Sequence, residues 1–242
     1  MEIIEIDSVY KYLKDSIFIG RGTTAYCFLK PDNTVVKIYN HSSSTAAMFS
    51  KVDMVQRLNN IHNIQNDTYI GPEKLIMKNG ELIGYIYPYI DAPTLQNTSL
   101  KTTIFDLYKD CPKLIEDTKK ISDLGFRLYD VHHKNILFNG NYYVIDLDKG
   151  RINDIQDYLI KCNMSAIKET VIGYLFNVKP WEVVIFDDEE INYLYKGNSW
   201  TNEEQIYNFF ETLAKKTDIS NPSVKQLRRK IGYKKYYNEY YH

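Results

Sequence analysis

Cysteine is scarce in this chain, and long apolar runs are missing altogether. The three cysteines, Cys27, Cys111 and Cys162, are odd in number, far apart and without a C-x-x-C pair. Their spacing argues against a disulfide framework and a zinc knuckle, and it is typical of a protein in the reducing cytoplasm. No apolar run approaches the length of a membrane helix, so we expect no membrane partner.

A strong net charge and a targeting signal are also missing. The 30 basic and 31 acidic residues leave a net charge of -1, so no overall field points to nucleic acid or to a membrane surface. The first residues, Met1–Asp7, carry acids where a signal peptide carries Lys or Arg. We therefore expect a cytoplasmic protein. Its 242 residues are 44% hydrophobic, which allows one large domain or two lobes.

Short apolar runs predict a small antiparallel sheet in the first third of the chain. Three strands are expected between residues 14 and 39, separated by a glycine-containing turn and by Pro31–Asn33. A helix of about residues 45–59 follows. A hairpin over Lys74–Tyr87 comes next, because its Asn79-Gly80 pair favours a tight turn.

Helix signals dominate the rest of the sequence. Pro112 suits the first turn of a helix over about 113–124, and Gly125 ends it. Thr201–Glu204 has the pattern of a capping box, and Asn221-Pro222 is expected to cap the last helix.

A hinge is expected at residues 88–93, because the prolines at both ends cannot extend a strand. The predicted fold is α+β. An N-terminal lobe over 1–90 carries a small antiparallel sheet and one helix, and a trimmed, mainly helical lobe covers 94–242.

Three oxygen-bearing side chains have a spacing that suits phosphoryl transfer. Asp130 and Asn135 are five residues apart, and Asp146 closes an apolar strand eleven residues later. An Asp can accept the proton of an attacking hydroxyl. The Asn and the later Asp offer the hard oxygen ligands that Mg²⁺ prefers. The spacing therefore predicts a magnesium and nucleotide site.

A glycine turn and a strand lysine lie upstream of that motif. Gly20 and Gly22 let the backbone approach phosphates closely, and Ala25 stands where a third glycine is expected. An ordinary hairpin turn explains two glycines equally well. Lys37 lies in an apolar strand, where it needs an anionic partner unless the strand is at an edge and the lysine faces solvent.

The order of these features resembles the protein-kinase-like superfamily over roughly residues 14–150. The resemblance implies a two-lobed kinase fold and transfer of the γ-phosphate of ATP, with Mg²⁺, to a hydroxyl. It also implies that Lys37 holds the α- and β-phosphates and that Asp130 is the catalytic base. Asn135 and Asp146 would be the metal ligands.

The resemblance also implies an adenine pocket. Cys27 and Val35 would cover the base, and Tyr87 would guard the back of the pocket. Backbone groups of Pro88 and Ile90 would bond to the adenine edge, since proline still offers its carbonyl oxygen.

Several positions depart from the protein-kinase pattern. Leu128-Tyr129 replace the usual His-Arg before the catalytic Asp, and Asp146-Leu-Asp148 replaces Asp-Phe-Gly. Between Lys37 and Glu73 the sequence contains no glutamate that a helix could offer to the lysine. Asp53 is the nearest acid on the predicted helix, and Gln56 is the polar alternative. This gap keeps a nucleotide-binding pseudokinase, acting as an interaction module, as one hypothesis.

His132, two residues after Asp130, is similar to the Asp-x-His pattern of aminoglycoside and choline kinases, and it is a further catalytic candidate. That pattern favours a small hydroxylated acceptor as the alternative. The interval of about forty residues from the hinge to Asp130 is closer to that of a protein kinase, so the expected acceptor is a serine or threonine hydroxyl of a protein. Metal binding by His132 and His133 is a sharper interpretation, but adjacent histidines on a loop are more often incidental.

Two charged segments have ordinary interpretations. Asp187–Glu190 resembles a solvated acidic loop rather than a cation site. The basic and aromatic tail from Lys225 could bind single-stranded nucleic acid. Val224, Leu227 and Ile231 keep a helical apolar spacing, however, which favours a helix packed on the body of the protein.

Overall fold

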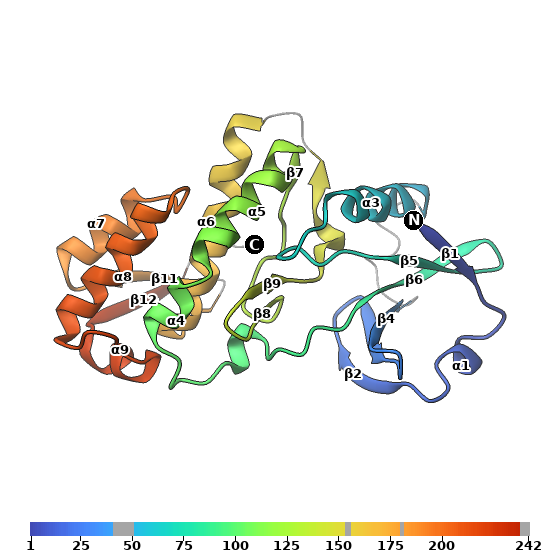
Figure 1. The fold of residues 1–242 in the computed structure, drawn as a ribbon, viewed down its shortest axis with the longest axis horizontal. Helices are drawn as coiled ribbons and strands as arrows, with labels where there is room; N and C mark the ends of the chain where they lie inside the picture. The colour runs from blue at the N-terminus through green and yellow to red at the C-terminus, as the bar shows by residue number, and fades with distance from the viewer. Residues whose placement is uncertain (41–50, 153–155, 180–181, 238–242) are drawn as a thin grey trace. The chain divides into compact units, whose positions relative to one another are not determined.

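The protein has a mixed α+β fold that divides into two compact units (Figure 1). The computed structural model describes residues 1–40, 51–152, 156–179 and 182–237, with the backbone alone for residues 51–53 and 156–157. Unit 1 consists of Met1–Asp91 and Asp146–Gly150, and unit 2 consists of Ala92–Ile145 and Arg151–His242.

Unit 1 is built on a six-stranded mixed sheet with the strand order β1-β5-β6-β4-β3-β2. The strands are β1 (Glu2–Glu5), β2 (Ile17–Arg21), β3 (Ala25–Leu29), β4 (Thr34–Tyr39), β5 (Lys74–Lys78) and β6 (Glu81–Pro88). The prediction of a purely antiparallel sheet is wrong, because β1 pairs in parallel with β5. A long stretch of chain separates these two strands, so no tight turn forces them to run antiparallel.

The predicted meander and hairpin are confirmed. β2, β3 and β4 pair antiparallel in chain order, and β5 and β6 form the hairpin. Asn79 and Gly80 have φ values of 51° and 73°, the left-handed pair that a tight hairpin turn requires. Turn chemistry therefore set the register of this hairpin as the sequence indicated.

The two faces of the sheet differ in chemistry because side chains alternate along each strand. One face packs an apolar cluster in which Val36, Ile38 and Ile76 are buried, with Val9 and Tyr12 of the short helix α1 (Val9–Tyr12) against it. Lys37 points to the opposite face, since its neighbours Val36 and Ile38 belong to the apolar cluster.

Helix α3 (Lys51–Ile64) lies beside the sheet (Figure 1) and continues past the predicted end at residue 59. Leu58, part of the predicted apolar stripe, is fully buried. The predicted start near residue 45, with Phe49, and the side chain of Asp53 lie outside the described residues.

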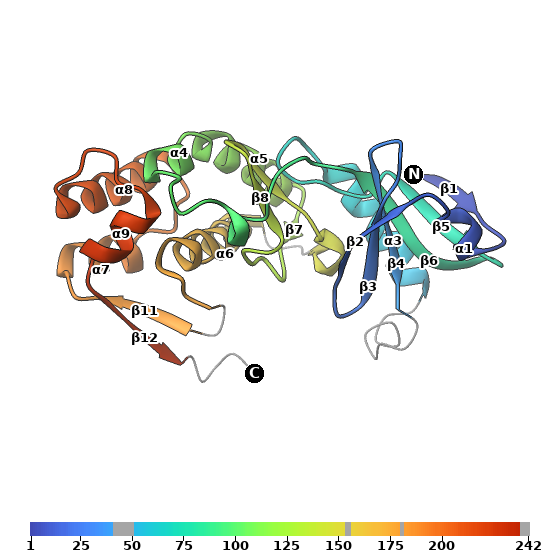
Figure 2. The same ribbon diagram turned by 90° about the horizontal axis from the view of Figure 1, so that it is seen from below.

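Unit 2 is mainly helical, as predicted, with three small two-stranded sheets. Its helices are α4 (Ile104–Tyr108), α5 (Cys111–Asp123), α6 (Gln156–Phe176), α7 (Glu189–Gly197), α8 (Glu203–Thr217) and α9 (Val224–Lys230), with a 3-10 turn η1 (Leu95–Asn97). The strand pairs are β7 (Phe126–Arg127) with β10 (Arg151–Ile152), β8 (Ile136–Phe138) with β9 (Tyr142–Val144), and β11 (Glu182–Phe186) with β12 (Tyr233–Tyr237). Helices α5 and α6 pack side by side, and Figure 2 shows the paired strands β11 and β12 below the helices.

Two predicted helix caps lie one or two residues from their observed positions. The cap of α8 is Asn202, which accepts a hydrogen bond from the Gln205 N–H, so the Thr201–Glu204 capping box is wrong. The last helix is capped by Ser223 rather than by Asn221-Pro222, because Ser223 and Gln226 form the reciprocal pair of bonds. Several Ser, Thr and Asn residues in a row compete for such a position, and tertiary packing selects one.

The C-terminal helix packs as its apolar spacing predicted. Val224 and Leu227 of α9 are fully buried. Asp188, within the acidic segment, caps α7 by accepting bonds from the N–H groups of Glu190 and Ile191. None of the described helices is both long enough and apolar enough to span a bilayer.

Candidate active site

A buried lysine with two carboxylate partners forms the polar centre of unit 1. The Lys37 ammonium donates to Asp148 Oδ2 at 2.8 Å and also bonds to Asp146 Oδ1. Lys37 and Asp148 have side chains that are only 7% exposed, whereas that of Asp146 is 33% exposed. Both acids follow β9, at and within the 3-10 turn η2 (Leu147–Lys149), which belongs to unit 1.

Two tyrosines surround the same carboxylate. The hydroxyls of Tyr39 and Tyr85 each donate to Asp148 Oδ2 at 3.5 Å. The Lys37 ammonium lies 5.4 Å from the centre of the Tyr85 ring, close enough for a cation–π contact. Asp148 is thus the acceptor for three neighbouring donors.

Burial and the charge of Asp148 together set the protonation of this cluster. Burial alone would lower the pKa of Lys37, but the Asp148 carboxylate, followed by Tyr85 and Asp146, raises that pKa well above its usual value. Burial first, and then the negative charge of Asp148, raises the pKa of Tyr39 and Tyr85 well above the ordinary range. Lys37 is therefore a permanent cation beside two neutral phenols.

Close backbone packing supports the lysine. Gly84 of β6 lies opposite Ile38, and a Cβ at this position would collide with the carbonyl oxygen of Lys37. Only glycine lets β6 approach β4 this closely.

The candidate adenine-pocket residues share the Lys37 face of the sheet. Cys27 lies opposite Lys37 on β3, and Val35 lies opposite Tyr87 on β6. Burial raises the pKa of the Cys27 thiol, and the Tyr87 hydroxyl contacts its sulfur at 4.0 Å. Val35 is buried.

The glycine turn and the hinge residues are also in unit 1. The N–H of Gly22 donates to the carbonyl of buried Ala25, which closes the turn between β2 and β3. A Cβ on Gly20 would meet no atom within 4 Å. Pro88 pairs with Thr34 at the end of β6, and Ile90 is half-buried beyond it.

The second group of predicted residues lies on one loop of unit 2. Asp130 is exposed and has a φ of 58°, in the left-handed region. The side-chain amide of Asn135 donates to the backbone carbonyl of Asp130 at 3.1 Å. Asn135 is buried, and its own carbonyl accepts a bond from the N–H of Ile145. The five-residue spacing therefore closes a compact loop, with the amide of Asn135 as its internal tie.

His132 lies next to Asp130 within this loop. Its Nδ1 accepts a hydrogen bond from the N–H of Lys134 at 3.3 Å, and its Nε2 is 3.7 Å from Asp130 Oδ1. Acceptance at Nδ1 leaves the proton of a neutral ring on Nε2, facing the carboxylate.

Two buried polar residues of α6 hold the loop, and sequence reasoning missed both. Asn163 accepts from the N–H of Leu128 at 2.8 Å and donates to the carbonyl of Phe126 at 2.8 Å. Thr170 donates to the carbonyl of Val131 at 3.1 Å. The two residues are seven apart and so lie on one face of the helix. Their polar character within an apolar helix is the signal that could have found them.

Asp130 and His132 also line a large cavity within unit 2, of about 1020 Å³. Its walls come from the loop, from one face of α6 and from residues just after α6. Polar groups on these walls include Lys161, Glu169 and Lys179.

The fold brings the predicted site residues together in two groups. The lysine, Asp146 and the candidate nucleotide residues belong to unit 1, and Asp130, His132 and Asn135 belong to unit 2. The described residues contain no cluster of three or more His, Cys, Asp or Glu side chains suited to a metal ion. The predicted partner Gln56 is exposed, and the described acids that contact Lys37 are Asp146 and Asp148.

The chain matches no known protein-family model, and no curated protein sequence matches it significantly.

Proposed function

We propose that this protein is a cytoplasmic phosphotransferase that moves the γ-phosphate of Mg²⁺–ATP to a hydroxyl. In this proposal unit 1 is the nucleotide-binding lobe and unit 2 the helical lobe of a protein-kinase-like fold. The predicted acceptor is a serine or threonine hydroxyl of a protein.

The Lys37 cluster is the observation that carries the proposal. A buried ammonium costs several kcal/mol unless anions compensate it. Here two carboxylates from a segment more than a hundred residues away compensate it, and one of them, Asp146, is still partly exposed. An always-charged lysine beside a reachable carboxylate suits a phosphate group and its metal ion.

In this proposal Asp148 takes the role of the glutamate that the helix after Lys37 lacks. An active kinase site needs an acid that keeps the lysine charged and oriented. Asp148 is buried, bonded to Lys37 and held by two tyrosine hydroxyls, so it supplies this acid from within unit 1. The absence of a glutamate between Lys37 and Glu73 therefore does not argue for an inactive protein.

The loop of unit 2 fits the roles proposed for its side chains. Because the amide nitrogen of Asn135 is held by Asp130, its Oδ1 remains as an oxygen ligand. Asp146 is the next residue in the chain after Ile145, whose N–H bonds to Asn135. The two proposed metal ligands are thus linked through Ile145, the residue that follows β9.

The glycine turn has an explanation in this function. Neither a positive φ nor packing requires glycine at Gly20 or Gly22, since a Cβ would fit at both positions. Close approach of the backbone to a bound phosphate is a physical reason for two glycines in this turn.

Each residue then has one task. Mg²⁺–ATP, when bound, supplies the phosphoryl group and the cation that neutralises its charge. Lys37 orients the phosphates, and Asn135 and Asp146 offer oxygen ligands. Asp130 accepts the acceptor's hydroxyl proton as that oxygen bonds to the γ-phosphorus and the bond to ADP breaks. The Nε2–H of His132 lies near the Asp130 carboxylate and orients it.

Substitution of Asp130 by Asn tests this role. We expect phosphoryl transfer to fall roughly a hundredfold or more, because a general base is lost while the shape is kept. The measurement is transfer from radiolabelled ATP to the protein itself, to generic protein substrates and to a metabolite panel.

Asp15→Asn is the matched control. Asp15 is also an exposed aspartate in the left-handed region, with a φ of 69°. Asparagine at this position must therefore adopt the same backbone conformation as asparagine at position 130. Equal transfer by Asp130→Asn and the wild type would contradict the proposal. Nucleotide binding without any transfer by the wild type would favour a pseudokinase.

The cavity beside Asp130 favours a second candidate, a small hydroxylated acceptor. Its volume of about 1020 Å³ is at the upper end of the range for small-molecule pockets, and it is lined by both charged and aromatic groups. We expect Ser165→Leu, which narrows the cavity from α6, to raise the KM for such an acceptor about tenfold while the KM for ATP stays unchanged. An unchanged acceptor KM would place the acceptor outside the cavity.

A further inference from the structure

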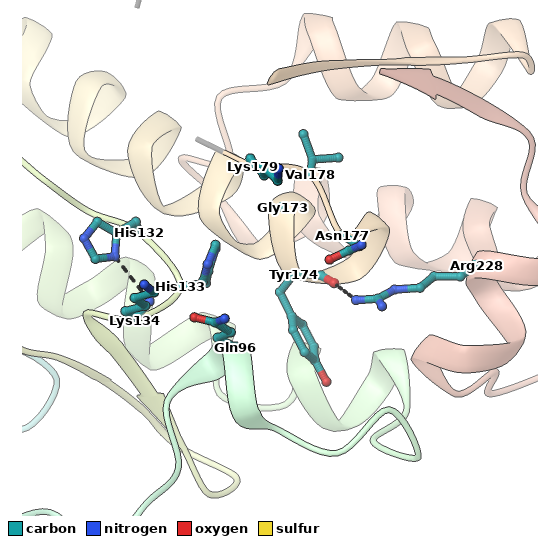
Figure 3. A pocket seen from close by; sticks show the side chains of 10 residues that line it. All are labelled: Gln96, His132, His133, Lys134, Gly173, Tyr174, Asn177, Val178, Lys179 and Arg228. Carbon is teal, nitrogen blue, oxygen red and sulfur yellow. Dashed lines mark hydrogen bonds between the residues drawn. The ribbon is translucent and has the colours of Figure 1, made fainter. Parts of the chain in front are cut away.

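A second pocket in unit 2, of about 400 Å³, lies beside the loop that follows Asp130 (Figure 3). It is formed by the loop, by η1, by the C-terminal end of α6 with the residues after it, and by α9. We call it the His133 pocket. Its polar lining residues are Gln96, His132, His133, Lys134, Tyr174, Asn177, Lys179 and Arg228, and two of them, His132 and Lys179, also line the cavity beside Asp130.

Several side-chain hydrogen-bond donors that line the His133 pocket have no partner within the described part of the protein. In the part of the chain that the structure describes, the side chains of Gln96, His133, Lys134 and Asn177 make no hydrogen bond or ion pair. In Figure 3 the ring of His133 lies between Lys134 and the buried Tyr174, with the amide of Gln96 below it. Two amides, an imidazole and an ammonium therefore line one small, solvent-accessible volume, and none of them is used by a bond within the described part of the protein.

The charged residues that line the pocket are all basic. The lining residues include Lys134, Lys179 and Arg228, and none of the ten is an Asp or a Glu. Arg228 donates two hydrogen bonds to the carbonyls of Leu175 and Tyr174 at the end of α6, where its charge offsets the negative end of the helix dipole. Lys134 keeps its full charge, with no carboxylate among the lining residues.

The environment of His133 reflects this imbalance. Burial lowers the pKa of His133, and electrostatic repulsion from the neighbouring His132 and Lys134 side chains lowers it further. An anion in the pocket would relieve that repulsion.

We propose that the His133 pocket binds a small phosphate monoester. A phosphate monoester at neutral pH carries close to two negative charges on three acceptor oxygens, which matches a basic lining with several amide, imidazole and ammonium donors better than a single carboxylate does. The volume is near the lower end for ligand pockets, so it fits a compound the size of a sugar phosphate. Buried Tyr174 and Val178 provide the apolar wall for its organic part. The site is independent of the proposed kinase function.

Titration calorimetry of the full chain with ribose 5-phosphate, inorganic phosphate and ribose tests this site. We expect ribose 5-phosphate to bind with a Kd below about 1 mM, inorganic phosphate to bind more weakly, and ribose not to bind. Lys134→Gln should weaken binding of the ester about tenfold, and Lys134→Arg should retain most of it because the charge is kept.

Lys119→Gln is the matched control, because Lys119 is an exposed lysine on α5 outside the pocket. Circular dichroism of each variant confirms that it is folded. Absence of saturable ribose 5-phosphate binding by the wild type would overturn the proposal. So would binding that falls with Lys37→Met but not with Lys134→Gln, since it would place the ligand in unit 1.

Discussion

Lys37 is a buried ammonium, and the free energy of burying it decides which neighbours it must have. An isolated charge in such a place would lose its proton or unfold the region. In the structure two carboxylates neutralise this charge, and Asp148 accepts hydrogen bonds from Lys37 and from the two tyrosine hydroxyls. Stability and the proposed phosphate chemistry therefore depend on the same residue.

Asp148→Asn is expected to destabilise the protein by about 2–4 kcal/mol. Removal of one partner leaves a buried charge, which typically costs about 3–5 kcal/mol, but Asp146 remains to compensate part of it. Equilibrium unfolding in urea measures the change. The double variant Lys37→Met/Asp148→Asn should be less destabilised than the sum of the two single variants, by roughly 1 kcal/mol or more.

Asp188→Asn provides the surface comparison. Asp188 pairs with Lys216 at 2.8 Å, but both groups are about one-third exposed, so the loss should stay below about 1 kcal/mol. Asn also remains a good helix cap. Similar losses for Asp148→Asn and Asp188→Asn would mean that the Lys37 cluster is solvated rather than buried.

Sequence spacing could identify the residues of this cluster but not their pairing. The five-residue interval from Asp130 to Asn135 is local, and in the structure the Asn135 amide bonds to the backbone carbonyl of Asp130. The Lys37–Asp148 bond joins residues 111 apart, and no periodicity encodes such a contact. The distant partner Asp148 could therefore be found only in the structure, and the side chain of the nearer candidate, Asp53, lies outside the described residues.

At the scale of elements, helix α6 acts as the scaffold of the Asp130 loop. Asn163 and Thr170 reach the loop from one face of the helix, and they satisfy backbone groups of Leu128 and Val131. A buried backbone carbonyl without a partner costs about 1–3 kcal/mol. The loop should therefore loosen when these bonds are removed.

Thr170→Val is expected to loosen the loop without changing the shape of the helix. The methyl replaces a hydroxyl that bonds to Val131 outside the helix and to Ala166 within it. We expect amide hydrogen exchange in the loop to rise about tenfold, equivalent to about 1.4 kcal/mol. This readout does not depend on any catalytic activity.

Thr118→Val is the matched control on helix α5. Thr118 is equally a buried helical threonine, and it donates to the carbonyl of Leu114 one turn earlier. The overall loss of stability should be similar, but exchange in the Asp130 loop should not change. Equal exchange in both variants would show that α6 does not hold the loop.

The elements that the sequence predicted are those with a local signal. The Asn79-Gly80 turn defines its hairpin, and Gly125 ends α5 with a φ of 79°. The β11–β12 pair went unpredicted, because Glu182 and Tyr237 are far apart in the chain and each strand needs the other. Strand β1 was not predicted for the same reason, because it pairs with β5, which lies far along the chain.

At the scale of the whole molecule, tyrosine is the most unusual part of the composition, with 22 residues. Several of them are buried with raised pKa values. Burial is the first cause for Tyr39, Tyr85, Tyr87 and Tyr142, whose pKa values all lie well above the ordinary range. These phenols belong to both units, so both should respond to alkaline pH.

The free energy of unfolding should therefore fall steeply above about pH 10. In the unfolded chain each tyrosine loses its proton near pH 10, whereas in the folded protein it stays neutral to a higher pH. The unfolded state is thus favoured as pH rises, by up to about 1.4 kcal/mol per pH unit for each buried tyrosine. The contribution of these groups is complete below pH 10 and is lost between the unfolded and folded pKa values. Lys37, whose pKa is also raised, acts in the same direction.

Urea unfolding at a series of pH values from about 8 to 11 measures this slope. Tyr142→Phe should make it shallower, because Tyr142 is fully buried and its hydroxyl only donates to the carbonyl of Leu107. Tyr10→Phe should leave it unchanged, since Tyr10 is 86% exposed. A free energy of unfolding that stays level to about pH 11 would show that the buried phenols titrate normally, and that the apolar setting of the Asp148 cluster is wrong.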